Sequence, residues 1–252
     1  MVKRKMLVTA LVRCSKCQLL HRVPTDDPSH NFSFYQEQYQ SGMTTDLPDP
    51  STLQALLDSK FRNTNKDISA RIEVLKSLGV APGTRVLDFG ASWGYGTWQL
   101  GNAGFHVVGY EVSKPRARFG RENLSIRLED DLGKLDGPFD LFFSSHVMEH
   151  VPSLSETIAL VKRIVKPGGL FVAFTPNGSL ERMRHDPGRY HRQWGDVHPN
   201  MLDELFYETS FPGRPKLFAS DPYDHKAIKG WDRKKDLVLS LTGEELLCAI
   251  VM

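Results

Sequence analysis

Cysteine is scarce in this sequence, which has three in 252 residues. Two of them, Cys14 and Cys17, form a CxxC, and the third, Cys248, lies far along the chain. Three cysteines are too few for the disulfide framework that is typical of small secreted proteins. We therefore expect a reducing environment, that is, a cytoplasmic protein.

The sequence also lacks an excess of charge of one sign. Thirty-two lysines and arginines stand against 30 aspartates and glutamates, which gives a formal net charge of +2, and the basic residues are scattered. Proteins that bind nucleic acids usually carry a basic patch or stripe that contacts the phosphates. A nucleic-acid partner is therefore not expected.

Long hydrophobic runs are missing as well. The apolar run 6–12 follows three basic residues, as in a secretion signal, but Arg13 ends it and no small-x-small cleavage site follows. Nowhere does the chain reach the ~18 consecutive apolar residues of a membrane span. We expect neither a cleaved signal nor a membrane span.

What is present is an ordinary globular composition, with 40% hydrophobic and 25% charged residues. Residues 1–50 differ from the rest, because they combine the CxxC with an aromatic polar stretch at 30–39 and a cluster of helix breakers at 46–50. They are expected to form an N-terminal arm or lid, and residues 51–252 the main domain. Apolar residues at helical spacing between 51 and 78 predict a helical start of that domain.

From residue 85 onward, strand-like and helix-like segments alternate. A capping box, in which Ser153 precedes Glu156, starts the clearest helix, which stops before Pro167. The alternation predicts a doubly wound α/β sheet with right-handed crossovers. Two final strands with no helix between them predict a terminal antiparallel hairpin and a total of seven strands. The strand candidates are 85–89, 106–111, 125–129, 139–145, 170–175, 216–220 and 245–251.

The loop after the first strand of this sheet is where a ligand is expected, because ligands bind at the carboxyl ends of the strands. A dinucleotide fingerprint, G-x-G-x-x-G, does not fit: counting from Gly90, the second and third glycine positions are Ser92 and Tyr95. Asp88 ends the strand, and its carboxylate would repel a pyrophosphate. The same charge suits a ligand with an ammonium and a sulfonium, which favours S-adenosylmethionine over NAD.

The next strand ends at Glu111, about twenty residues after the loop, where a carboxylate can accept hydrogen bonds from both ribose hydroxyls of a nucleotide. We therefore predict that Glu111 binds the ribose. The alternative is an acidic residue in a turn that only contacts solvent.

Four segments together resemble the class I S-adenosylmethionine-dependent methyltransferases, which have a Rossmann-like fold. They are the strand and loop 86–94, the strand end 108–111, residues 139–151 and the turn 165–170, and the similarity extends over about 68–251. The family's usual second glycine in the first motif is Ser92 in this chain. The resemblance implies S-adenosylmethionine as cofactor, S-adenosylhomocysteine as product and a small-molecule acceptor.

The resemblance also implies residue roles. Asp88 and the loop 90–94 would shape the methionine side of the cofactor site, and Glu111 would bind the ribose. Asp130 or, preferably, Asp131 would flank the adenine together with Leu132, and two residues after the fourth strand would lie beside the methyl donor. The cofactor-binding set is thus Asp88, Gly90, Ala91, Ser92, Gly94, Glu111, Asp130, Asp131, Leu132, Ser145 and His146.

Methyl transfer needs a base only when the acceptor must lose a proton. His146 directly follows the fourth strand and is the preferred candidate, with His198 and His150 as further catalytic candidates. His150 and its neighbour Glu149 have an alternative interpretation, a structural pair that joins strand to helix. A long polar and aromatic loop after the fifth strand, which includes His185, His191 and His198, is interpreted as acceptor binding or as a solvated loop.

The segment around Cys14 and Cys17 resembles the second knuckle of a zinc ribbon that precedes some sugar and natural-product methyltransferases. The first CxxC is missing. His21 and His30 would have to complete a tetrahedral zinc site, and the spacing matches no standard module. We therefore predict a metal-free hairpin, with Cys14 and Cys17 as the candidate ligands if zinc does bind.

These features predict a methyltransferase that modifies a hydroxyl of a sugar or sugar-containing natural product. The alternatives are a quinone or other small phenol as acceptor, an amino sugar that is methylated on nitrogen, and a non-catalytic module that only binds S-adenosylmethionine. The oligomeric state does not follow from the sequence.

Overall fold

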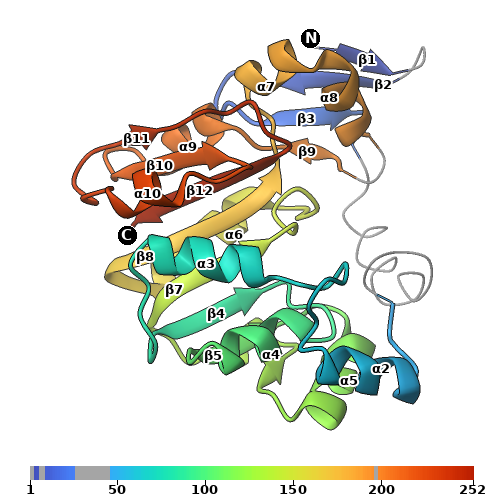
Figure 1. The fold of residues 1–252 in the computed structure, drawn as a ribbon. Coiled ribbons are helices and arrows are strands. Elements are labelled where there is room, and N and C mark those ends of the chain that lie inside the picture. Colours follow the sequence, from blue (N-terminus) through green and yellow to red (C-terminus); the bar gives the residue numbers. More distant parts are fainter. Residues whose placement is uncertain (1–2, 6–8, 26–45, 196–197) are drawn as a thin grey trace. The chain divides into compact units, whose positions relative to one another are not determined.

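The computed structural model describes residues 3–5, 9–25, 46–195 and 198–252 (Figure 1). His30 and most of the predicted arm lie outside the described residues. The chain divides into two compact units: residues 28–142, called the central unit for their place in the sequence, and residues 1–27 with 143–252, called the terminal unit. The predicted boundary at residue 50 stays a prediction.

The central unit contains parallel strands in the order β7-β4-β5-β6, of which β7 continues into the terminal unit. The register aligns Asp88 of β4 with Gly109 of β5. Helix α4 packs on β5 and helix α5 on β6. The bounds are α2 Pro50–Asp58, α3 Ser69–Ser77, β4 Arg85–Phe89, α4 Tyr95–Asn102, β5 His106–Tyr110, α5 Lys114–Leu124, β6 Leu128–Glu129, the 3-10 helix η2 Leu132–Lys134 and β7 Phe139–Ser145.

The terminal unit contains two groups of strands. One has the order β1-β2-β3-β9, and the other β11-β10-β12-β8-β7, in which β12 is antiparallel to both β8 and β10. The bounds are β1 Lys3–Lys5, β2 Thr9–Arg13, β3 Leu20–Val23, α6 Leu154–Ile164, β8 Val165–Pro176, α7 Leu180–His185, α8 Pro187–Gln193, β9 Asn200–Met201, α9 Glu204–Ser210, β10 Lys216–Ser220, α10 His225–Lys229, β11 Leu237–Val238 and β12 Glu245–Val251.

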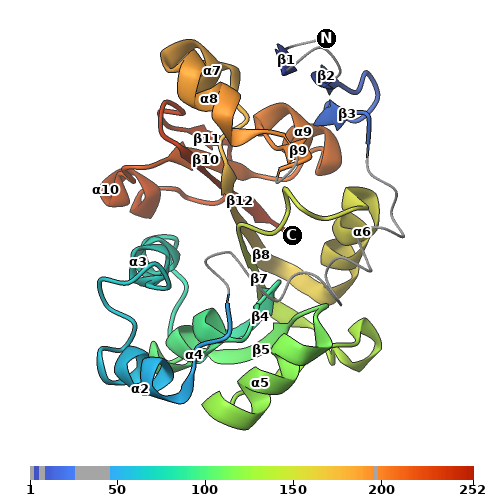
Figure 2. The same ribbon diagram turned by 90° about the vertical axis from the view of Figure 1, so that its right-hand side faces the viewer.

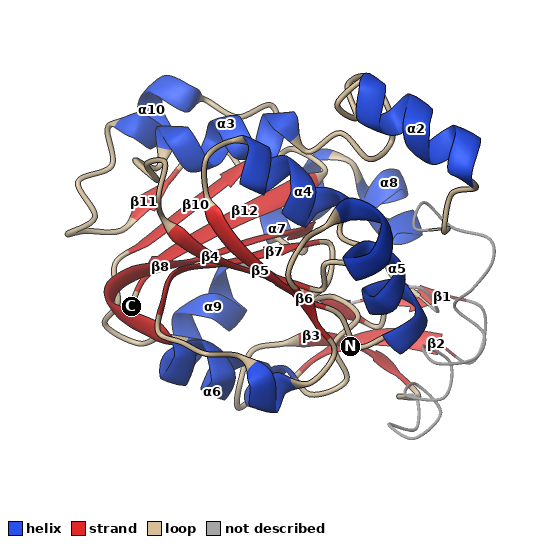
Figure 3. Cartoon of the chain, turned by 90° about the horizontal axis from the view of Figure 1, so that it is seen from below, coloured by secondary structure: helices blue, strands red, loops and turns tan. Residues whose placement is uncertain are grey.

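Aromatic residues fix the helices of the terminal unit on its sheet. Phe171 of β8 contacts Tyr207 and Phe211, which belong to α9 and its end. On the same strand, Phe174 contacts Tyr223, which precedes α10. Helices α6 and α9 therefore cover one face of this part of the sheet and α10 the other, as Figure 3 shows.

The N-terminal hairpin belongs to the terminal unit. Strand β3 pairs antiparallel with β9, with Leu20 opposite Met201 (Figure 2). The side chain of Arg13 donates to Asp203 at 2.6 Å, just before α9. The hairpin is thus bound to a segment almost 200 residues away, which its sequence does not indicate.

Four predictions about elements differ from the structure. The helical stretch 51–78 is two helices, α2 and α3, and the strand expected at 125–129 is only the two-residue strand β6. The tail strands β10 and β12 do form an antiparallel pair, but α10 and β11 lie between them in the chain. Because β11 pairs in parallel with β10, the described sheet has eight strands and not seven.

The described helices include none that combines the length and the apolar character needed to cross a membrane.

Candidate active site

The loop between β4 and α4 has the unusual backbone that its sequence predicts. Gly90 and Gly94 have φ angles of 80° and 88°, and Ser92 has a φ of 52°. The left-handed region is strained for residues other than glycine, so Ser92 occupies a position where glycine would be unstrained. Backbone N–H groups of Gly90 and Ala91 both donate to the Tyr110 carbonyl at 2.8 and 2.9 Å, which holds the loop against the end of β5.

Asp88 lies buried directly before this loop, with 4% of its surface exposed. The Thr97 hydroxyl donates to its Oδ2 at 2.7 Å. Burial raises the pKa of Asp88 to about 6, the Thr97 hydrogen bond lowers it, and the negative charge of Glu111 raises it further. Sequence reasoning had not identified Thr97, because a threonine in a helix carries no distinctive pattern.

Glu111 is equally buried and is held by the backbone. Its two oxygens accept hydrogen bonds from the N–H groups of Ser92 at 2.9 Å and Ser113 at 2.8 Å. Burial raises the pKa of Glu111, although the two N–H groups and the positive charge of Arg116 act against it. Arg116 is itself buried and donates to the Ser92 hydroxyl at 3.0 Å. It was not predicted from the sequence.

These residues fit the methionine and ribose parts of S-adenosylmethionine. Burial is the main cause of the raised pKa of Asp88, and repulsion by the buried Glu111 carboxylate adds to it. A ligand with an ammonium group relieves that repulsion, whereas a pyrophosphate increases it. Each oxygen of Glu111 carries one backbone hydrogen bond, so lone pairs are left for hydroxyl donors.

The two aspartates after β6 occupy different environments. Asp130 is in an ion pair with Arg121 at 3.1 Å. Asp131 caps the short helix η2, with its Oδ1 accepting from the Gly133 N–H at 2.8 Å, and Leu132 is 41% exposed. An exposed leucine beside a fixed carboxylate is compatible with contact to an adenine, and the preference for Asp131 stays a prediction.

His146 follows Ser145 directly after β7 and has a left-handed backbone, with a φ of 53°. Its Nε2 lies 2.6 Å from a Glu245 carboxylate oxygen and its Nδ1 3.3 Å from a Glu149 oxygen. Desolvation lowers the pKa of His146, but hydrogen bonds and charge from the two glutamates outweigh it and raise the pKa to about 9. At neutral pH this histidine is therefore protonated and cannot accept a further proton until it gives one up.

A cavity of about 380 Å³ lies next to His146 in the terminal unit. Among the described residues, six of its seven lining residues have polar or charged side chains, although most of the wall surface is contributed by apolar atoms. The seven are His146, Pro176, Gln193, His198, Asp221, Glu244 and Glu245. The sequence pointed to the two histidines. The others were not identified, because Glu245 lies 99 residues after His146 and only the pairing of β12 with β8 and β10 brings it there.

The remaining two predicted histidine sites, His150 and His198, lie close together. Their ring centroids are 4.9 Å apart, and Nδ1 of His198 lies 2.5 Å from the Gln193 carbonyl oxygen. Glu149 is fully buried, with His150 Nε2 3.9 Å from its Oε1. Burial raises the pKa of Glu149, but His146 and His150 outweigh that effect and lower it.

The segment predicted as a long acceptor-binding loop is mostly helical. It forms α7 and α8, capped by Ser179 and Asp186. Tyr190 and Trp194 are buried in a core cluster with residues of β2, β3 and β9. These two aromatic side chains therefore support the fold, and the interpretation of this segment as an open loop was wrong.

The CxxC forms a tight turn between β2 and β3. The Cys14 N–H donates to the Leu19 carbonyl and the Gln18 N–H to the Cys14 carbonyl. The pKa of Cys14 is lowered, because backbone N–H groups of Cys17 and Lys16 point at its sulfur. Across the described residues, neither cysteine belongs to a group of three ligand side chains. The predicted absence of zinc stays a prediction.

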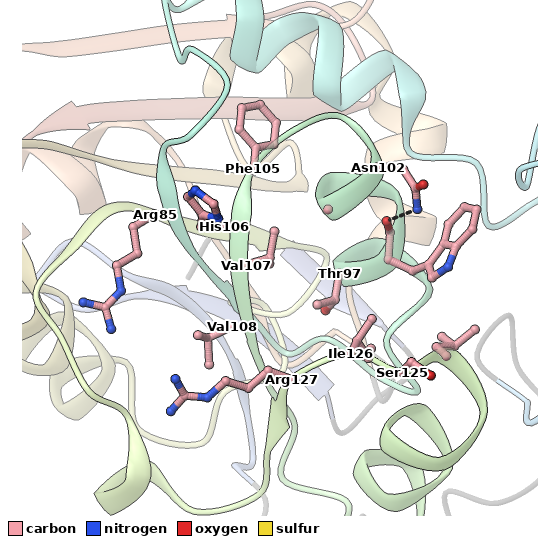
Figure 4. A pocket seen from close by; sticks show the side chains of 13 residues that line it. Arg85, Thr97, Asn102, Phe105, His106, Val107, Val108, Ser125, Ile126 and Arg127 are labelled. Atoms are coloured by element: carbon pink, nitrogen blue, oxygen red, sulfur yellow. Dashed lines mark hydrogen bonds between the residues drawn. The ribbon is translucent and has the colours of Figure 1, made fainter.

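A larger cavity, of about 580 Å³, lies on the central unit and includes none of the predicted site residues (Figure 4). Arg85 and Arg127 project at one end of it. Both are already in ion pairs with Asp136, at 3.0 and 3.1 Å. Arg127 also pairs with Glu129 at 3.1 Å, so two carboxylates balance the two arginines and leave no strong anion site at this end of the cavity.

Comparisons with known proteins identify the family. The sequence pattern described as a methyltransferase domain matches residues 14–211. An uncharacterized methyltransferase of Synechocystis is 36% identical over 106 residues, which are 38% of this chain and 49% of that protein. The demethylmenaquinone methyltransferase of Tropheryma whipplei is 26% identical over 187 residues, or 70% of this chain and 72% of that protein.

Solved structures agree on the fold. A TehB-like methyltransferase from Corynebacterium glutamicum has a TM-score of 0.52 at 17% identity, over 89% of this chain and 99% of that one. The magnesium protoporphyrin IX methyltransferase of Synechocystis, solved with bound S-adenosylmethionine, has a TM-score of 0.52 at 14% identity, over 91% of this chain and 99% of that one.

Two of the relatives that are similar in sequence are matched over only part of their length. The chain spans about half of the Synechocystis protein and 28% of a sterol 24-C-methyltransferase of Gibberella zeae. The matched pattern nevertheless covers most of this chain, which confirms the predicted family, and the solved structures confirm the predicted fold. The chain belongs to the methyltransferase domain family.

Proposed function

We propose that this protein transfers the methyl group of S-adenosylmethionine to a hydroxyl of a small, polar acceptor, a sugar or a sugar-containing natural product. The observation that carries the choice of acceptor is the cavity beside His146. Six of its seven described lining residues have polar or charged side chains, and four of them, Asp221, Glu244, Glu245 and Gln193, offer carboxylate or amide oxygens. Such oxygens accept hydrogen bonds from the many hydroxyls of a sugar.

The cofactor, when bound, supplies an electrophilic methyl group on a sulfonium. The chain's own contribution is to bind and orient the reactants. Asp88 supplies a negative charge for the ammonium, and Glu111 accepts hydrogen bonds from the ribose hydroxyls. On the acceptor side, His146 and the two glutamates that bind it offer a proton-exchanging group at the cavity. Positioning of this kind accounts for most of the rate enhancement in a displacement reaction.

A small phenol or quinone precursor is the second candidate acceptor, and the relatives favour it. One of them is the demethylmenaquinone methyltransferase already described. Another is a ubiquinone biosynthesis O-methyltransferase of Aromatoleum aromaticum, 26% identical over 133 residues, which are 49% of this chain and 57% of that protein. Flat aromatic acceptors usually bind between apolar side chains, and Pro176 is the apolar residue in the described lining. This contrast ranks the sugar first.

The test is transfer of a deuterated methyl group. The full-length protein is incubated with deuterated S-adenosylmethionine and two extracts, one rich in polar sugar derivatives and one rich in phenols and quinones. Mass spectrometry then detects labelled products. We expect a labelled sugar derivative whose label resists mild acid as an O-methyl ether. Label in a phenol instead, or on nitrogen of an amino sugar, would contradict the proposed acceptor.

A matched pair of variants connects the product to the cavity. Gln193→Ala removes an amide that lines it, whereas Gln54→Ala removes an exposed amide on α2 of the central unit. The first is expected to raise the KM for the acceptor, and the second to leave it unchanged. If the protein binds the cofactor normally but neither extract yields a labelled product, the non-catalytic alternative is supported.

A further inference from the structure

Three side chains of the terminal unit, Glu149, His150 and His198, converge at one point. Each offers one ligand atom, and these atoms all lie within 4.8 Å of one another. The ligands of a tetrahedral metal ion, each about 2.1 Å from it, lie about 3.4 Å apart. The Glu149 Oε1 to His150 Nε2 distance of 3.9 Å is already close to that value. Small side-chain rotations would bring the other ligand atoms to the same separation.

Glu149 is unusual because it is a fully buried carboxylate whose side-chain partners, within the described part of the chain, are histidines. Its side chain is 0% exposed, and the contact to His146 that lowers its pKa is a long one. The groups in ion-pair range are nitrogens of His146 at 3.3 Å and His150 at 3.9 Å. A buried carboxylate is costly unless positive charge compensates it. His146 supplies part of that charge, and a metal ion held by Glu149 and His150 would supply more.

His198 is prepared to act as a ligand by a hydrogen bond on the opposite side of its ring. Its Nδ1 lies 2.5 Å from the Gln193 carbonyl oxygen. A carbonyl can only accept, so Nδ1 carries the proton and Nε2 keeps its lone pair. Histidines that bind metals in proteins commonly donate their other N–H to a carbonyl in this way.

The backbone holds the two segments of the cluster together. Asn200, two residues after His198, donates from its N–H to the Glu149 carbonyl at 3.3 Å and from its side chain to the Val151 carbonyl at 3.1 Å. Strand β9, which contains Asn200, is also paired with β3. The geometry of the cluster thus depends on the folded terminal unit and is not a chance approach of mobile side chains.

We propose that Glu149, His150 and His198 bind one divalent first-row transition-metal ion. Two imidazoles and one carboxylate are the donors that such ions prefer, whereas Mg²⁺ and Ca²⁺ favour oxygen ligands alone. Three protein ligands leave at least one coordination position open. Because His198 also lines the cavity, that position is available to an acceptor hydroxyl. The binding of the metal itself does not depend on the proposed acceptor.

The experiment measures Zn²⁺ binding to the chelator-treated full-length protein, without cofactor or acceptor. Isothermal titration and elemental analysis after dialysis are expected to give one zinc per chain. Glu149→Gln, which preserves the side-chain volume, and His198→Ala should each lower the affinity about tenfold or more. His106→Ala, an exposed histidine of the central unit, should leave it unchanged.

The variant Cys14→Ser distinguishes zinc bound by this cluster from zinc bound by the CxxC. If the cluster binds the metal, that variant keeps its zinc, and Co²⁺ in the wild type shows visible absorption without the intense thiolate charge-transfer band in the near ultraviolet. Circular dichroism and S-adenosylhomocysteine binding confirm that each variant is folded. Wild-type protein that retains no zinc, zinc retained by folded His198→Ala protein, or zinc lost in Cys14→Ser would each overturn the proposal.

Discussion

At the scale of single residues, three buried carboxylates stand out in the described part of the chain. Asp88, Glu111 and Glu149 are 4%, 6% and 0% exposed. Burying a charged group costs several kcal/mol unless other groups compensate it. Asp88 and Glu111 follow adjacent strands at the cofactor loop, and Glu149 belongs to the histidine cluster. We expect bound ligands to compensate these charges.

The first prediction concerns the ribose. Glu111→Ala should weaken S-adenosylhomocysteine binding by about 1.5–3 kcal/mol, the range for hydrogen bonds to a charged group. Calorimetry measures this, and Glu122→Ala, an exposed acid on α5, is the control. Unchanged affinity in the Glu111 variant would remove this residue from the site.

The second prediction is a pH dependence at Asp88. Its pKa is raised from 3.8 to about 6, so the folded protein holds this proton more tightly than the unfolded chain does. The resulting stabilisation is fully present below pH 3.8 and is lost as the pH rises through about 6. At neutral pH the ionised carboxylate therefore destabilises the ligand-free protein, while it favours a cationic ligand.

Asp88→Asn should consequently raise the melting temperature of the ligand-free protein at neutral pH and lower the affinity for S-adenosylhomocysteine. In the wild type, that affinity should fall as the pH decreases through about 6, and the variant should lose this dependence. Asp58→Asn, at an exposed position of α2, is the control. A variant that is both less stable and equally pH-dependent would show that Asp88 is not the titrating group.

At the scale of elements, the N-terminal hairpin is joined to the rest of the terminal unit by β3, β9 and one buried ion pair. Arg13 donates to Asp203, whose side chain is 1% exposed and also caps α9 through the Phe206 N–H at 3.0 Å. Burial raises the pKa of Asp203, and Arg13 acts against it. One carboxylate thus fixes both a helix start and a distant strand.

The third prediction follows from this shared carboxylate. Arg13→Met keeps the aliphatic part of the side chain but leaves Asp203 without its cation, which should lower the free energy of unfolding by about 1.5–3 kcal/mol. Urea denaturation measures it. The double variant Arg13→Met with Asp203→Asn should lose less free energy of unfolding than the two single variants lose together, because the two residues interact directly. Additive losses would mean that the pair does not couple the hairpin to α9.

At the scale of the whole molecule, the predicted cofactor residues lie mostly in the central unit, and the histidine cluster and its cavity lie in the terminal unit. Turnover needs both groups of residues, whereas cofactor binding is assigned to the first. Variants that separate the two functions are therefore informative.

The fourth prediction concerns the base. If His146 or His198 is the base, the alanine variant of that histidine, His146→Ala or His198→Ala, should lower turnover by about 10²–10⁴-fold and leave cofactor affinity nearly unchanged, because proton transfer acts on the transition state. Since the pKa of His146 is raised to about 9, the wild-type rate should still increase with pH above neutrality if His146 is the base. If both variants keep turnover within a few-fold of wild type, an amine acceptor, which needs no base, becomes the leading hypothesis.

The sequence by itself determined the family and the main parallel strands. Strands 85–89 and 139–145 were located to the residue, because a strand buried on both faces must be nearly continuous in apolar residues and is bounded by turns. Asp88, Gly90 and Glu111 were predicted as cofactor residues for a related reason: they stand at fixed distances from those strands, and their role stays a prediction. Their conformation depends on local geometry, which a short segment encodes.

Tertiary structure alone decided the partners of those residues. Glu245 meets His146, and His198 meets Glu149 and His150, because β12 and β9 return to the sheet from distant parts of the chain. The pairing of such strands depends on the packing of whole faces, which no local pattern contains. Tyr190 and Trp194 belong to a segment that is rich in polar and aromatic residues. They proved to be core residues, because they pack against strands from distant parts of the chain. Residues that lie at the end of a strand could be predicted from the sequence, whereas the meeting of side chains from distant segments could not.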